Sequence, residues 1–169
     1  MSYKFMFDTN VFDAILSEDI SLDAIKEHYE IFVTHIQRDE IEAITKPDKQ
    51  EKKIQLLKYF KELDNQNLPT ESSVLETSRL GNAKLSKMPT ESAVYGVSRW
   101  GEAKWTSEES LIEILRKGNL KHTEDALIGE TAIKNNLILV TNDPRLMKKV
   151  ISLGGKAITF DQLKNGNIQ

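Results

Sequence analysis

Four acidic residues are spread along the chain, each at a junction between predicted elements of secondary structure. Asp8 directly follows an apolar run that predicts a strand, and Asp143 ends the segment that begins with a second such run, whereas Glu40 and Asp125 lie in or open predicted helices. Carboxylates at the carboxyl ends of the strands of an α/β sheet meet in one crevice, where such folds place their sites. Several carboxylates in one crevice repel each other unless a positive charge lies among them, and a hard divalent cation is the usual solution. The pattern therefore predicts a metal-binding site.

Strands and helices alternate along most of the chain. Short apolar, β-branched or aromatic runs predict strands at residues 3–7, 31–34, 137–141 and 156–160. Amphipathic runs predict helices at residues 11–17, 22–29, 36–45, 49–64, 123–135 and 144–153. This alternation favours an α/β fold whose central parallel sheet is covered on both faces.

Some helix starts and faces can also be predicted. Ser21 and Thr123 are expected N-caps. The helix at 49–64 is expected to be amphipathic, with Lys and Glu on one face. Its apolar face would carry residues at three-residue steps, which are Ile54, Leu57, Phe60 and Leu63.

Each of the four acids also has an ordinary structural explanation. Asp8 and Asn10 can cap the helix after the first strand, and Asp143, followed by proline, is a favourable N-cap. Asp125 can stabilise the first turn of its helix, and Glu40 can be a solvated helix residue. Taken singly, each acid fits the structural role better. Their joint placement at two strand ends and two adjoining helices favours a shared site.

Composition restricts the classes of protein that this chain can belong to. Its 169 residues suffice for one domain, and the 39% apolar and 29% charged residues are typical of a soluble globular protein. No apolar run approaches the roughly 20 residues that span a bilayer, and the first residues lack the apolar segment of a signal peptide. The absence of cysteine excludes disulfides and thiolate metal sites. A cytoplasmic protein without a membrane partner is expected.

The net charge of −3 argues against strong, non-specific binding of nucleic acid by the whole surface, but it does not exclude a nuclease. Local basic clusters could receive phosphate instead. Solvated helix faces are the simpler interpretation of these lysines. They are Lys46, Lys49, Lys52 and Lys53, followed by Lys148 and Lys149.

A tandem duplication interrupts the alternation of strands and helices. Residues 69–85 recur as residues 89–105, with ten of seventeen aligned positions identical. Each copy is predicted to form a capped helical segment, so we interpret 69–105 as a duplicated helical insertion in a single domain of 1–169. Two similar helices packed side by side are the simpler explanation. A lobe that grips nucleic acid is the alternative, because basic residues lie beside aromatic ones in the second copy.

The motifs around the acids resemble those of the PIN-domain nucleases, a family that includes bacterial VapC-like ribonucleases. The resemblance covers nearly the whole chain outside the duplication. Asp8 in Phe-Asp-Thr-Asn-Val-Phe resembles the first acid of the family, and Glu40 resembles the second. Asp125 in Glu-Asp-Ala-Leu-Ile-Gly-Glu-Thr-Ala resembles the third, and Asp143 in Val-Thr-Asn-Asp the fourth. Neighbouring polar positions also match, namely Thr9, Asn10, Thr141 and Asn142.

The resemblance implies a three-layer α/β/α sandwich and an enzyme that hydrolyses RNA phosphodiester bonds with Mg2+ or Mn2+. Asp8, Asp125 and Asp143 would be metal ligands, and Glu40 a ligand or a base that orients water. Thr9, Asn10, Thr141 and Asn142 would support them from the second shell. The expected partners are an RNA substrate, a second copy of the chain in a homodimer and, if the chain is a toxin, an antitoxin protein. An RNA-processing enzyme without an antitoxin is equally compatible.

Two alternatives stay open. A catalytically silent PIN-like module could bind RNA or protein, although the complete acidic set argues against it. A receiver-like or phosphatase domain could use Asp8 as a covalent phosphoacceptor. The Asp-Thr-Asn sequence lacks the second Asp of the common phosphatase pattern.

Overall fold

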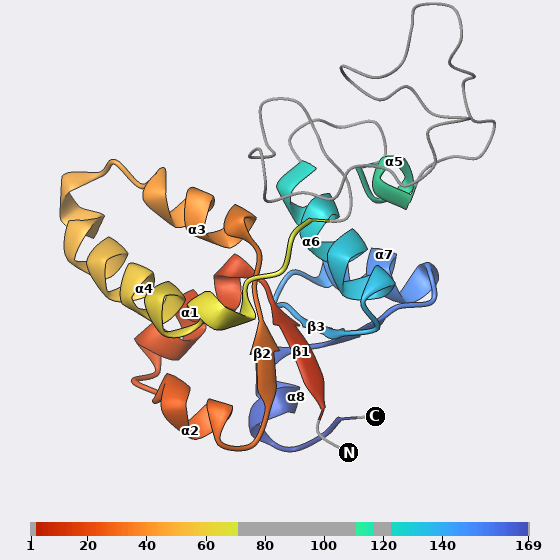
Figure 1. The fold of residues 1–169 in the computed structure, drawn as a ribbon, viewed down its shortest axis with the longest axis horizontal. Helices are drawn as coiled ribbons and strands as arrows, with labels where there is room; N and C mark the ends of the chain where they lie inside the picture. Colours follow the sequence, from red (N-terminus) through yellow and green to blue (C-terminus); the bar gives the residue numbers. More distant parts are fainter. Residues whose placement is uncertain (1–2, 71–110, 117–122, 169) are drawn as a thin grey trace, which may run out of the picture.

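A four-stranded parallel sheet forms the centre of the computed structural model, which describes residues 3–70, 111–116 and 123–168 (Figure 1). The strand order is β2-β1-β3-β4, and each neighbouring pair is parallel. The strands are β1 (Lys4–Phe7), β2 (Glu30–Phe32), β3 (Ile138–Val140) and β4 (Lys156–Ile158).

Consecutive residues of the strands point to opposite faces of the sheet, as the pleat requires. Phe5 and Phe7 belong to one hydrophobic core, whereas Met6 between them belongs to a second core. In β3, Val140 joins the first core and Leu139 the second. Because both faces are apolar, both must be covered by helices.

Helices cover each face of the sheet (Figure 1). The first core takes apolar side chains from α1 (Thr9–Ser17), α2 (Leu22–Lys26), α4 (Gln50–Glu62) and α8 (Phe160–Lys164). The second takes them from α5 (Leu111–Arg116), α6 (Thr123–Lys134) and α7 (Pro144–Ser152). Helix α3 (His35–Glu42) contributes to both cores, through Ile41 and Ile36 respectively. The predicted α/β class is confirmed, and the layers are those of an α/β/α sandwich.

All strands and helices predicted outside the duplicated insertion are present, and their ends differ from the predicted ones by at most three residues. Helices α5 and α8 were not predicted, nor were the short 3-10 helices η1 (Pro47–Lys49) and η2 (Asp64–Gln66). Ser21 is the N-cap of α2, as predicted, although its side chain makes no capping hydrogen bond. Thr123 is the first residue of α6 and is buried, so its predicted position as N-cap is wrong by one residue.

The buried face of α4 differs from the predicted one. Ile54 is 68% exposed, whereas Leu56 and Phe60 are buried together with Leu63, which follows the helix. Steps of three residues rotate by 300°, so a row built on them drifts around the helix. Steps of four and three residues alternate about the true period of 3.6 and keep Leu56, Phe60 and Leu63 on one side.

The duplicated insertion at 69–105 lies outside the described residues except for Pro69 and Thr70. Its helical nature and the single-domain assignment therefore remain predictions. None of the helices within 3–70, 111–116 and 123–168 is long and apolar enough to cross a membrane.

Candidate functional site

The order of the strands places the predicted site at a topological switch point. Strand β1 lies between β2 and β3, so the chain leaves β1 toward one side and later returns on the other. Asp8 directly follows β1, and Thr141 directly follows β3. Crevices at such switch points, beyond the carboxyl ends of the strands, are the usual binding sites of open α/β sheets.

Asp8 is held by three hydrogen bonds at the end of β1. Its Oδ1 accepts from the Thr9 backbone N–H at 2.8 Å. Its Oδ2 accepts from the Thr141 hydroxyl at 2.6 Å and from the Asn10 amide at 2.5 Å. Asp8 is only 4% exposed, so these donors replace much of the water that its carboxyl group would otherwise bind. Asp8 is also the N-cap of α1, as expected.

The two asparagines extend this network toward β4. The Asn10 side-chain oxygen accepts from the Asn142 backbone N–H at 2.9 Å. The Asn142 side-chain oxygen in turn accepts from the Phe160 backbone N–H at 3.2 Å, at the start of α8. The segments after β1, β3 and β4 are therefore tied together by side chains that the sequence motifs singled out.

Glu40 reaches the site from α3. A capping box starts this helix. The Gln37 side-chain oxygen accepts hydrogen bonds from the backbone N–H and the hydroxyl of Thr34, and the Thr34 hydroxyl oxygen accepts one from the Ile36 backbone N–H. One turn later, the Glu40 carboxylate accepts a hydrogen bond from the Thr9 hydroxyl. Thr9 thus contacts both acids, Asp8 through its backbone and Glu40 through its side chain.

Burial raises the pKa of Asp8 to about 6. The Thr141 hydrogen bond opposes this change, and the negative charge of Asp125 adds to it. Burial likewise raises the pKa of Glu40 to about 7, against the hydrogen bond from Thr9. The charges of Glu124, Asp8 and Asp125 raise it further. These mutual effects show that Asp8, Glu40 and the first turn of α6 face one region.

Asp143 has a different environment. Its Oδ1 accepts from the Arg145 backbone N–H at 2.8 Å, which caps α7 with Pro144 at the first helical position. Its backbone N–H donates to the Thr141 hydroxyl at 3.0 Å. The structure therefore connects Asp143 to Asp8 through Thr141, and the role of its carboxylate as a metal ligand remains a prediction.

The donor chemistry of this region fits a hard divalent cation. Asp8 and Glu40 offer carboxylate oxygens, and a cation would stabilise the charged forms of both groups, which burial and, secondarily, mutual repulsion disfavour. Within the described part of the chain, no three acidic or histidine side chains stand close enough to hold an ion together. Mg2+ usually keeps several waters and takes only one or two carboxylates, which this spacing permits.

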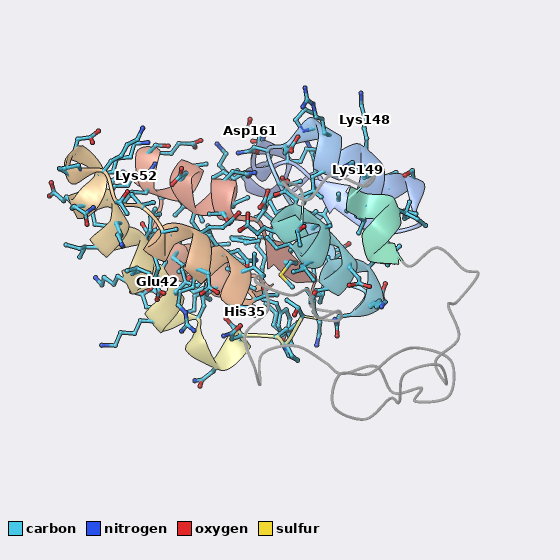
Figure 2. All side chains as sticks on the ribbon, turned by 90° about the horizontal axis from the view of Figure 1, so that it is seen from above. His35, Glu42, Lys52, Lys148, Lys149 and Asp161 are labelled. Carbon is cyan, nitrogen blue, oxygen red and sulfur yellow. The ribbon has the colours of Figure 1, made fainter. Side chains whose placement is uncertain are left out.

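The basic residues that could receive phosphate mostly have structural partners. Lys52 pairs with Asp13 at 2.9 Å. Lys53 donates to the Glu42 carbonyl oxygen at 2.6 Å, and Lys149 to the Leu115 carbonyl oxygen at 2.7 Å. Figure 2 shows Lys148 pointing away from the body of the protein. Solvation and helix capping thus explain these lysines better than a phosphate site.

Sequence reasoning missed two residues of this region. Glu124 directly precedes Asp125, and its charge acts on Glu40. Its position in the first turn of a predicted helix was the available signal. Gln37 joins α3 to the end of β1 through its side chain, as described below. The Thr-x-x-Gln spacing of a capping box predicts the contact of Gln37 with Thr34, but not its contact with the sheet.

A scan against protein-family models found no matching family, and a search of the curated proteins found no matching relative. The resemblance to PIN-domain nucleases therefore rests on the motifs of this sequence. The fold and the arrangement of Asp8, Glu40 and Asp125 stand on the structure independently of that resemblance.

Proposed function

We propose that this protein is a metal-dependent ribonuclease of the PIN-domain type. The observation that carries the proposal is that Thr9 joins Asp8, at the carboxyl end of β1, to Glu40 of α3. The charge of Asp125 from α6 acts on both acids. Carboxylates buried together raise each other's pKa values and weaken folding at neutral pH unless a cation lies among them. A hydrolytic metal site is the use that best suits oxygen ligands in such a crevice.

In this proposal one or two of the carboxylates of Asp8, Asp125 and Asp143 would bind Mg2+ or Mn2+ directly, and the rest would bind it through its waters. When bound, the ion would make water a better nucleophile and stabilise the leaving oxygen. Glu40 is a further ligand or orients the attacking water and takes its proton. Thr9 and Thr141 fix the carboxylates of Glu40 and Asp8 by hydrogen bonds. Asn10 and Asn142 hold the strand ends in register around them.

RNA as the substrate comes from the resemblance, as do the expected partners. A cytoplasmic enzyme that forms a homodimer fits the proposal. A toxin with a cognate antitoxin is one form of it, and growth arrest on expression, relieved by Asp125→Asn, would support that form. An RNA-processing enzyme without an antitoxin is the other, and it predicts no arrest.

Cleavage of a mixed set of end-labelled RNAs tests the proposal. Purified protein is incubated with Mn2+, with Mg2+ and with EDTA, beside the Asp8→Asn/Asp125→Asn double variant. We expect cutting by the wild type with metal only, and a loss of at least about 100-fold in the double variant. Urea titration measures the folded fraction of the variant, so that lost activity is not ascribed to unfolding.

A silent PIN-like module that binds RNA or protein is the second candidate. The observation that favours it is the lack of three closely spaced ligands within the described residues. Binding of Mn2+ separates the two. A protein that is folded, cuts none of the RNAs and binds no Mn2+ at millimolar concentration would support the silent module.

A further inference from the structure

The side chain of Gln37 joins two parts of the proposed site. It is fully buried on α3. Its Nε2 donates to the Phe7 carbonyl oxygen at 2.7 Å, while its Oε1 accepts from the Thr34 backbone N–H at 2.9 Å and from the Thr34 hydroxyl at 2.6 Å. One amide group thus spans the end of β1 and the start of α3.

The position of the Phe7 carbonyl explains why a side chain binds it. Pairing between β1 and β2 runs to Met6 opposite Phe32. After Phe32 the chain leaves β1: Val33 forms a β-bridge with Asn67, and Thr34 is the N-cap of α3. The Phe7 carbonyl therefore lies where the ladder to β2 has ended, and the Gln37 amide supplies a donor to a buried group that needs one.

Both ends of this link lie next to proposed site residues. Phe7 directly precedes Asp8 in the chain. Gln37 and Glu40 are three residues apart in α3, so their side chains leave the same face of the helix. Glu40 then accepts the hydrogen bond of Thr9, which follows Asp8. Two hydrogen bonds, Gln37 to Phe7 and Thr9 to Glu40, therefore connect α3 to the chain on both sides of Asp8.

We propose that Gln37 is a positioning residue that holds Glu40 against Thr9 and Asp8 by hydrogen-bonding the last carbonyl group of β1. This inference rests on the proposed function, because it concerns the same site. Gln37 does not touch the reacting atoms. It fixes the rotation and height of α3 relative to the strand that carries Asp8, and both are needed for two acids on different elements to act together.

The chain contains a matched control. Helix α8 begins with a second Thr-x-x-Gln capping box, in which Gln162 Oε1 accepts from the Thr159 backbone N–H at 2.8 Å. Gln162 is exposed, and among the described residues the only hydrogen bond of its side chain is that of the cap. Gln162→Met therefore removes a capping box, while Gln37→Met removes a capping box and the link to the sheet.

The experiment compares wild type, Gln37→Met and Gln162→Met in single-substrate RNA cleavage with Mn2+, with the folded fraction of each checked by urea titration. For Gln37→Met we expect kcat to fall about 10- to 100-fold, with the KM for RNA changed less than about threefold. Gln162→Met should keep kcat within about twofold. If Gln37→Met does not fold, Gln37→Glu replaces it, since glutamate suits a capping box but lacks the N–H donor for Phe7.

Binding of Mn2+, followed by the EPR signal of the free ion, gives a readout besides activity. We expect Gln37→Met to bind the same number of ions as wild type, about 10-fold more weakly. Equal kcat and equal Mn2+ affinity in Gln37→Met and Gln162→Met would overturn the positioning role while the nuclease stands. A wild-type protein that neither cuts RNA nor binds Mn2+ would instead overturn the proposed function, and the positioning role with it.

Discussion

The hydroxyl group of Thr141 donates a hydrogen bond to the Asp8 carboxylate over 2.6 Å. The same hydroxyl oxygen accepts the backbone N–H of Asp143 at 3.0 Å. One side chain thus joins the residue after β1 to the turn after β3. It also stabilises the charged form of Asp8, because a hydrogen bond donated to a carboxylate favours its ionised state.

Replacing this hydroxyl should change the titration of Asp8. In Thr141→Val the pKa of Asp8 should rise above its value of about 6, because the bond that opposes burial is lost. The free energy of unfolding should fall by about 1–3 kcal/mol at pH 8, since a buried carboxylate loses a partner. Carbon-13 NMR of the Asp8 carboxyl group measures the pKa directly.

Thr131→Val is the control for that experiment. Thr131 is also fully buried, but its hydroxyl donates to the Leu127 carbonyl oxygen within α6 at 2.7 Å. It should leave the pKa of Asp8 unchanged. A lower or unchanged pKa in Thr141→Val would contradict the role given to this hydroxyl.

Without metal, stability should fall as pH rises through the range from about 4 to about 7. The pKa values of Asp8 and Glu40 are about 6 and about 7 in the folded protein, against 3.8 and 4.5 as ordinary values. As the pH rises, the unfolded chain releases these protons at a lower pH than the folded protein does. The free energy of unfolding therefore falls until the folded protein has released them too. The loss should amount to about 3 kcal/mol from Asp8, with a further contribution from Glu40 that solvent screening reduces.

Urea unfolding in EDTA between pH 4 and pH 8 measures this effect. The Asp8→Asn/Glu40→Gln variant cannot release these protons, so its stability should vary less over the same range. Equal slopes for the variant and the wild type would show that the two carboxyl groups have ordinary pKa values in the folded protein.

Metal should reverse the loss of stability. At about 100 times its dissociation constant, Mn2+ should stabilise the protein by about 3 kcal/mol, because it binds the folded chain. The gain should be larger at pH 8 than at pH 5, where the ligands are protonated. Thermal unfolding with and without Mn2+ checks this for wild type, for Asp8→Asn/Asp125→Asn and for Asp161→Asn. Only the double variant should lose this stabilisation, because Asp161 pairs with Lys164 on α8 instead. If the double variant kept it, the metal would bind at a different site.

The packing of α6 on α7 can be tested at Gly155. A Cβ atom there would lie 2.7 Å from a side-chain carbon of Ile133 and 2.8 Å from one of Val150. Gly155→Ala should therefore lower the free energy of unfolding by about 1–3 kcal/mol. At Gly129 the closest approach is 3.2 Å, so Gly129→Ala should cost less. Urea titration compares the two, and the opposite ranking would contradict this packing.

How far the sequence predicts this protein depends on the range of each interaction. The strands and their order of alternation followed from local apolar runs, and Asp8 and Asp143 follow strands as expected. The buried face of α4 was predicted wrongly because two registers of apolar residues share Phe60 and Leu63 on that helix. Only tertiary packing, which buries Leu56 and leaves Ile54 exposed, distinguishes them.

Long-range contacts were harder to predict. The motifs pointed to Thr9 and Thr141, but not to which acid each would bind. The link from Gln37 to Phe7 joins residues 30 positions apart and depends on where β2 stops pairing. No local sequence pattern predicts where β2 stops pairing with β1.

We propose that Asp8, Glu40, Asp125 and Asp143 form one cation-binding site at the carboxyl end of the sheet. Anomalous scattering from crystals grown with Mn2+ tests it most directly. We predict a peak at bonding distance, about 2.0–2.3 Å, from a carboxylate oxygen of Asp8 and of at least one other of these acids. Peaks only at other acidic groups, or none at millimolar Mn2+ with these carboxylates ordered, would contradict it.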